Sequence, residues 1–119
     1  MINFKRLDHV LITVPEGMLE EAAHFYSEVL ALPEIPGEHP GGALWFSIAG
    51  VEIHLRMEAG ENYSDRHSAF EVHDLDEAKA FLESKNVPIT HSSEIEGRKR
   101  LFFRDPFENR FELIEFLHS

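Results

Sequence analysis

The pattern of apolar and polar residues in the first half of the chain predicts short strands around one helix. The alternating, branched segment Leu7–Val14 is typical of a strand, and Pro15-Glu16-Gly17 is expected to turn the chain after it. Met18–Leu32 has apolar residues at helical spacing and glutamates in its first turn, which predicts a helix. Three short strands are expected to follow, near Pro33–Pro36, Leu44–Ile48 and Val51–Met57.

The second half repeats this order of elements after the polar segment Glu58–Arg66. His67–Val72 is predicted to be a strand. Asp74 is expected to cap a helix that runs to about Lys85, with Glu77 at the capping-box position. Three further strands are expected, near Pro88–His91, Arg100–Arg104 and Arg110–Phe116.

The two halves overlay with a shift of 58 residues (67 − 9). The shared order of elements predicts an α+β fold of two βαβββ modules in tandem, spanning about residues 4–57 and 67–117 of a single 119-residue domain. Mixed, curved sheets are expected to form a cup between the modules.

Four side chains able to bind a metal occupy matched positions in the two modules. His9 and His67 open the first strands, and His54 and Glu112 lie in the last strands. The separation is 45 residues in both modules (54 − 9 and 112 − 67). Strand alternation directs the apolar neighbours to the opposite face, so the four side chains are expected to converge on one divalent metal ion. Imidazole and carboxylate ligands without thiolate suit Zn, Ni, Fe, Co or Mn.

Composition and charge exclude several other classes of function. Hydrophobic residues make up 43% of the chain and charged residues 28%, and no apolar run approaches the roughly 20 residues that span a bilayer. The N-terminus has no signal-like apolar stretch, so a cytoplasmic protein is expected. The absence of cysteine excludes disulfides, thiolate metal sites and a cysteine nucleophile. The net charge of −11 disfavours nucleic acid and anionic membranes as partners.

Five segments carry the motifs of a known superfamily: Asp8-His9-Val10, Phe25–Leu30, Val51–Leu55, His67–Phe70 and Arg104–Glu115. In these segments, and over essentially its whole length, the chain resembles the vicinal oxygen chelate superfamily of glyoxalase I, bleomycin resistance proteins, fosfomycin resistance enzymes and extradiol dioxygenases. In glyoxalase I-like members, ligands occupy all four matched positions, whereas dioxygenase and fosfomycin-enzyme members do not use the position of His54. Bacterial glyoxalase I usually has glutamate there, so His54 is expected to be either a fourth ligand or a neighbour of the ligands.

The resemblance implies that a small substrate chelates the metal through adjacent oxygen atoms. The expected function is an isomerase or lyase acting on an α-oxo compound, with Glu112 as the catalytic residue that carries the proton. One alternative is an Fe(II) extradiol dioxygenase. Another is a binding protein without turnover, like the bleomycin resistance proteins, in which an aromatic groove would be lined by Trp45, Phe46, Phe102 and Phe103.

Several residues outside the four matched positions also give rise to expectations. Fosfomycin resistance fits the length, but Ser92–Leu101 lacks the serine and tyrosine pattern expected around a phosphonate. Arg98, Lys99 and Arg100 are open to binding an anion, with a solvated turn favoured. Glu108 stands where the superfamily usually has glycine, so its turn is expected to be distorted. Surface roles are assigned to the remaining histidines, His24, His39, His73, His91 and His118.

Short members of the resembled superfamily usually form homodimers in which the first half of one chain faces the second half of its partner. The resemblance therefore implies a homodimer with metal sites shared between the chains. Closure of the two halves of one chain on each other is the alternative.

Overall fold

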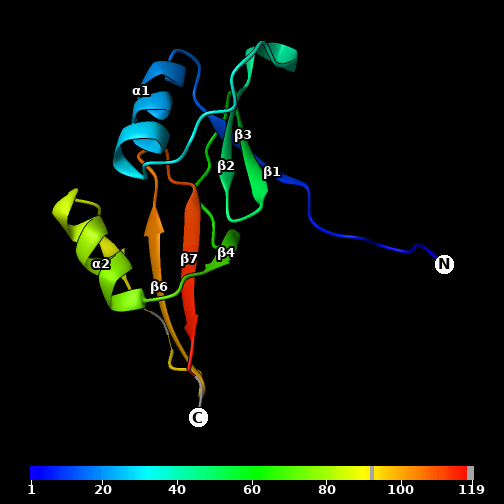
Figure 1. The fold of residues 1–119 in the computed structure, drawn as a ribbon. Helices are drawn as coiled ribbons and strands as arrows, with labels where there is room; N and C mark the ends of the chain where they lie inside the picture. Colours follow the sequence, from blue (N-terminus) through cyan, green and yellow to red (C-terminus); the bar gives the residue numbers. More distant parts are fainter. Residues whose placement is uncertain (92, 118–119) are drawn as a thin grey trace. The chain divides into compact units, whose positions relative to one another are not determined.

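The computed structural model of the 119-residue chain describes residues 1–91 and 93–117. The chain divides into two compact units, Met1–Ala59 and Gly60–Ser119, and each unit contains a mixed sheet and a helix (Figure 1). The boundary falls inside the polar segment Glu58–Arg66. The predicted fold class, α+β with two modules in tandem, is confirmed. Over the described residues, no helix is long and apolar enough to cross a membrane.

The first unit contains a three-stranded sheet in the order β1-β3-β2. Its strands are β1 (His9–Val14), β2 (Leu44–Ile48) and β3 (Val51–Met57). Strand β3 runs parallel to β1 and antiparallel to β2. The strand predicted at Pro33–Pro36 is reduced to a single bridge between Glu34 and Phe46. A proline at each end of this segment lacks an N–H group, which prevents a longer ladder.

The helix predicted over Met18–Leu32 forms in two parts. Helix α1 (Leu19–His24) continues as a π-helical turn, Phe25–Val29, in which the Leu30 amide donates to the Phe25 carbonyl at 2.9 Å. The wider turn accompanies burial of two adjacent aromatic side chains, Phe25 and Tyr26. The helix ends at this point because Ala31 takes a positive φ of 58°.

One face of the first sheet forms the core of its unit. Ile12 and Val14 of β1 are buried, and so are Ile53 and Leu55 of β3. Their neighbours His9 and His54 lie on the other face, as the strand alternation predicts.

The second unit contains a four-stranded sheet in the order β4-β7-β6-β5. Its strands are β4 (His67–Glu71), β5 (Ile89–Thr90), β6 (Arg98–Arg104) and β7 (Arg110–Phe116). Helix α2 (Leu75–Ser84) packs against β5, β6 and β7 and lies beside β6 in Figure 1. The Asp74 carboxylate accepts a hydrogen bond from the Glu77 amide at 3.0 Å, which confirms the predicted cap.

The turn between β6 and β7 is organised by Asp105. This carboxylate is 3% exposed and accepts hydrogen bonds from the amides of Phe107 and Asn109, each at 2.9 Å. Glu108 follows with a φ of +75°, in the region that favours glycine. The turn keeps its hydrogen bonds, so the distortion expected from the sequence is limited to backbone strain at Glu108 itself.

Candidate metal-binding site

In the first unit, the two predicted ligands belong to a column of stacked rings. The rings of His9 and His54 lie 4.0 Å apart between centroids with planes 13° apart. Trp45 also stacks on His54, with ring centroids 4.0 Å apart and nearly parallel planes. His39 in turn stacks on Trp45, again with centroids 4.0 Å apart. Strand pairing sets this column, because Trp45 lies directly opposite His54 across β2 and β3.

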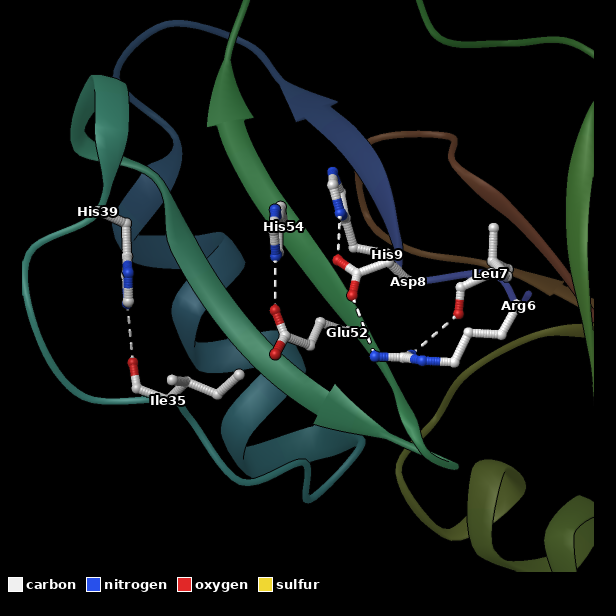
Figure 2. A network of polar contacts seen from close by, with 8 residues as sticks. All are labelled: Arg6, Leu7, Asp8, His9, Ile35, His39, Glu52 and His54. Carbon is white, nitrogen blue, oxygen red and sulfur yellow. Dashed lines mark hydrogen bonds and ion pairs between the residues drawn. The ribbon is translucent and has the colours of Figure 1, made fainter. Parts of the chain in front are cut away.

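Each of the two histidines shares one ring nitrogen with a carboxylate (Figure 2). His9 Nδ1 lies 2.9 Å from Asp8 Oδ2, and His54 Nε2 lies 2.8 Å from Glu52 Oε1. Within the described part of the chain, the second nitrogen of each ring has no hydrogen-bond partner, and in Figure 2 both second nitrogens point away from the carboxylates. The hydrogen bond with His9, together with the nearby Arg6 charge, lowers the pKa of the Asp8 carboxyl below its usual value.

Hydrogen bonds from neighbouring residues hold the side chains at both ends of the column in place. The Asp8 carboxylate also accepts from Arg6 at 3.2 Å, and the His39 ring is held by the Ile35 carbonyl at 3.0 Å. His39, for which a surface role is expected, is half-buried, and its ring packs against Trp45. A cleft of about 510 Å³ adjoins Asp8 and Glu52, but neither His9 nor His54 lines it.

In the second unit, the two predicted ligands touch each other. His67 Nε2 lies 2.9 Å from Glu112 Oε1, and His67 Nδ1 lies 2.8 Å from the Asp65 carbonyl oxygen. The Glu112 residue is only 5% exposed. Its second oxygen, Oε2, accepts a hydrogen bond from Arg100 Nη1 at 3.2 Å.

The sequence analysis did not identify Arg100 as a partner of Glu112. Arg98, Lys99 and Arg100 were expected in a solvated turn, but they form the start of β6, and the Arg100 side chain is 14% exposed. Its position diagonal to Glu112 depends on the register of β6 against β7, in which Phe102 lies opposite Glu112. Hydrophobic periodicity carries no information on that register.

The structure thus brings His9 together with His54, and His67 together with Glu112, in different units. Among the residues that the structure describes, no group of three or more histidine, aspartate or glutamate side chains is arranged to hold a metal ion. Three further residues contact these pairs in ways that the sequence analysis did not predict: Asp8, Glu52 and Trp45. A signal existed for two of them, since Asp8 precedes His9 directly and Glu52 lies two residues before His54 on the same strand face.

The aromatic residues and the remaining histidines named from the sequence lie in different surroundings. The four aromatic residues proposed for a groove do not share a face, because Phe46 and Phe103 pack in the cores whereas Trp45 and Phe102 lie beside the predicted ligands. His24, His73 and His91 are exposed, as predicted, and His118 lies outside the described residues.

Comparisons with known proteins agree with the resemblance in the sequence. A crystal structure from Bacillus anthracis, of a protein assigned to the glyoxalase family, matches with a TM-score of 0.86 and 34% identity over 98% of this chain and 99% of that chain. Lactoylglutathione lyase from Agrobacterium tumefaciens matches at 0.75 and 21% identity, over 95% of each chain. A variant of the fosfomycin resistance protein FosX from Listeria monocytogenes, complexed with Mn(II) and 1S,2S-dihydroxypropylphosphonic acid, matches at 0.74 and 21% identity over 93% and 90%.

No curated protein matches this chain. The profile of the Glyoxalase/Bleomycin resistance protein/Dioxygenase superfamily, however, matches residues 6–113. With that match and the 34% identity over nearly the whole chain, the protein belongs to the Glyoxalase/Bleomycin resistance protein/Dioxygenase superfamily.

Proposed function

We propose that this protein is a metal-dependent enzyme of the glyoxalase type, with isomerase or lyase activity on a small α-oxo compound that chelates a metal through adjacent oxygen atoms. The metal is one divalent ion, Zn, Ni, Fe, Co or Mn. Its ligands are the four residues at matched positions, His9, His54, His67 and Glu112.

The observation that carries the proposal is the state of the three histidines. Each has one ring nitrogen on an oxygen acceptor: the carboxylates of Asp8 and Glu52, and the carbonyl of Asp65. An acceptor on one nitrogen fixes the tautomer, so that the other nitrogen of His9 and of His54 presents a lone pair, which is the usual arrangement of histidines that bind metals. The other nitrogen of His67 faces Glu112 Oε1 at 2.9 Å. The donor set therefore fits a divalent transition metal.

Glu112 fits the same site. It is buried, and its partners are a histidine and an arginine. A metal would replace the proton that His67 and Glu112 share, and so would satisfy the same two atoms. Because Arg100 occupies Oε2, the other oxygen, Oε1, is the atom that binds the metal or carries a proton.

When bound, the metal supplies positive charge that stabilises negative charge on the substrate oxygens and acidifies the adjacent C–H group. Glu112 is the one carboxylate among the four proposed ligands, and it removes that proton at Oε1 and returns it to the neighbouring carbon. Arg100 positions the carboxylate for both transfers. The lyase neighbour from Agrobacterium supports this type of reaction, and the Mn(II) complex of FosX supports a metal in this fold.

The test begins with elemental analysis of purified protein, in which we expect about one divalent metal per chain. His9→Ala and His67→Ala should each lower metal affinity by at least about tenfold. The matched control is His73→Ala, since His73 is exposed and lies outside the strands that carry the proposed ligands. Equal metal content in all three variants would contradict the site.

Activity is then measured with α-oxo-aldehydes and with catechols, using each metal in turn. Glu112→Gln is expected to reduce turnover of the α-oxo substrate by at least about a hundredfold at saturating metal, because an amide cannot carry the proton. Turnover of catechols with Fe(II) alone would replace the proposal with the dioxygenase alternative. Tight ligand binding to metal-free protein without turnover would favour a binding protein.

A further inference from the structure

Arginine side chains gather on the sheet face that carries His67 and Glu112. In the register of β6 and β7, Arg104 lies directly opposite Arg110, and Phe102 lies opposite Glu112. His67 of β4 lies beside Arg110 on the other side of β7. Arg104 and Arg110, here called the arginine pair, therefore border the predicted metal ligands on one face.

The arginine pair is ordered by aromatic rings and by neutral acceptors. The guanidinium carbon of Arg110 lies 4.0 Å from the centroid of the Phe102 ring, and that of Arg104 lies 4.2 Å from the centroid of the Tyr63 ring. Each side chain also donates one hydrogen bond to a backbone carbonyl, Arg104 to Glu108 at 2.8 Å and Arg110 to Asp65 at 3.1 Å. These contacts hold the side chains in place and leave further N–H donors on each guanidinium group.

The positive charge of the pair is poorly balanced. Like charges directly opposite each other in an antiparallel pair are destabilising. Among the described residues, one carboxylate lies within ion-pair distance, Asp65 at 3.9 Å from Arg110, and its side chain is 95% exposed. Arg104 has no ion pair within the same described ranges. An anion bound between the two guanidinium groups would relieve this repulsion.

We propose that the arginine pair is an anion site for the non-chelating end of the substrate, which carries a carboxylate, phosphate or phosphonate group. This inference rests on the proposed function, because the metal would hold the other end. Neighbouring strands lie about 5 Å apart, and residues two apart on one strand about 7 Å, so a substrate with a backbone of a few atoms reaches from the ligands to the pair.

The charge of the whole chain favours a small anion over a polyanion. The net charge is −11, which repels an extended phosphate backbone. A single oxyanion meets only the local positive charge of the face.

The site can be tested without the metal. We would follow amide signals of ¹⁵N-labelled, metal-free protein by NMR during titration with inorganic phosphate and, separately, with malonate. The expected shifts centre on Arg104, Arg110 and Tyr63. Arg104→Gln and Arg110→Gln should each weaken binding by about tenfold or more, since each removes charged hydrogen bonds. Lys99→Gln is the matched control, because it removes the same charge from another residue of β6, whose ammonium contacts Asp76 at 3.3 Å.

Each outcome decides a separate point. Binding of phosphate alone indicates a phosphate or phosphonate end, and binding of malonate alone indicates a carboxylate end. Absence of shifts with both anions, or equal losses in Lys99→Gln, overturns the inference. Binding of a single-stranded oligonucleotide without binding of either small anion also overturns it. If the glutamine variants fail to fold, two other results decide. One is the location of the shifts in the wild-type protein. The other is the anion affinity of Arg110→Lys, which keeps the charge but loses the forked donors of the guanidinium group.

The metal and anion measurements fail independently. Anion binding without metal binding would contradict the proposed function alone. Metal binding without anion binding would contradict the anion site alone.

Discussion

At the scale of single residues, the contact between Arg100 and Glu112 is the main feature that links stability to the proposed chemistry. Both side chains are largely buried, with exposed fractions of 14% and 6%. A buried carboxylate is costly unless charged or polar partners surround it. Arg100 and His67 are those partners here. The stability of this unit therefore depends on the network of charged and polar side chains around the Glu112 carboxylate.

We predict that Arg100→Gln destabilises the metal-free protein by about 3 kcal/mol, because it leaves the Glu112 charge buried with one partner fewer. Urea unfolding measures the change. The control, Lys99→Gln, breaks an ion pair whose side chains are 41% and 82% exposed and should cost less than about 1 kcal/mol. The double variant Arg100→Gln, Glu112→Gln should recover part of the loss. Equal effects of Arg100→Gln and Lys99→Gln would refute the buried pair.

At the scale of secondary-structure elements, strand pairing converts local sequence into the two halves of the site. In the first unit, β2 and β3 bring the Trp45 ring against His54. Trp45 is the single tryptophan of the chain, so its fluorescence reports directly on this column.

We expect Trp45→Ala to lower metal affinity by roughly tenfold, because the His54 ring loses the surface that orients it. Trp45→Phe should keep most of the affinity, since a phenyl ring still stacks. Competition with a chromophoric chelator at constant pH gives both affinities. An alanine variant that binds metal like the wild type would show that the column has no positioning role.

The turn between β6 and β7 offers a test of backbone strain. Glu108 has a φ of +75°, and its contact with Arg104 uses only its carbonyl oxygen, which glycine also has. Glu108→Gly should therefore stabilise the protein by about 0.5–1 kcal/mol, the relief of left-handed strain less the added entropy of the unfolded chain. Thermal unfolding measures it, with Glu61→Gly as the control at an exposed loop position without positive φ. A loss of stability in Glu108→Gly would mean that the glutamate side chain contributes more than the strain costs.

At the scale of the whole molecule, each unit holds two of the four proposed ligands, so neither unit alone completes the proposed set. We propose a homodimer in which the first unit of one chain and the second unit of its partner share each metal, giving two equivalent sites by two-fold symmetry.

A mixing experiment tests the shared sites. One chain carries His9→Ala with His54→Ala, and the other carries His67→Ala with Glu112→Ala, so that each is expected to be metal-free alone. After mixing and refolding, the heterodimer should regain about one metal, because one intact first unit then meets one intact second unit. No regain of metal, or a wild type that sediments as a monomer with full metal content, would rule out sharing.

The elements of this protein were largely predictable from its sequence, because they depend on local periodicity and local capping. The Asp74 cap and the ligand-bearing faces of β1 and β3 follow from residues a few positions apart. The equal 45-residue separations also identified candidate pairs, and the structure brings each pair together within its unit. Local rules fell short where the backbone departs from regular geometry, as at the π-helical turn Phe25–Val29 and the proline-bounded segment 33–36, and at the start of β6, which was expected to be a turn.

The surroundings of the candidate ligands were decided by tertiary structure alone. The contact between Arg100 and Glu112, the opposition of Arg104 and Arg110, and the stacking of Trp45 on His54 all depend on which residues face each other across neighbouring strands. Register is set by the fit of the buried faces and by the turns, and a shift of one residue would direct every side chain to the other face. A shift of the register by two residues keeps the same side chains on the same face, so the periodicity of a strand does not distinguish between such registers. The sequence therefore determined which face carries the chemistry, and only the folded sheet determined the partners on it.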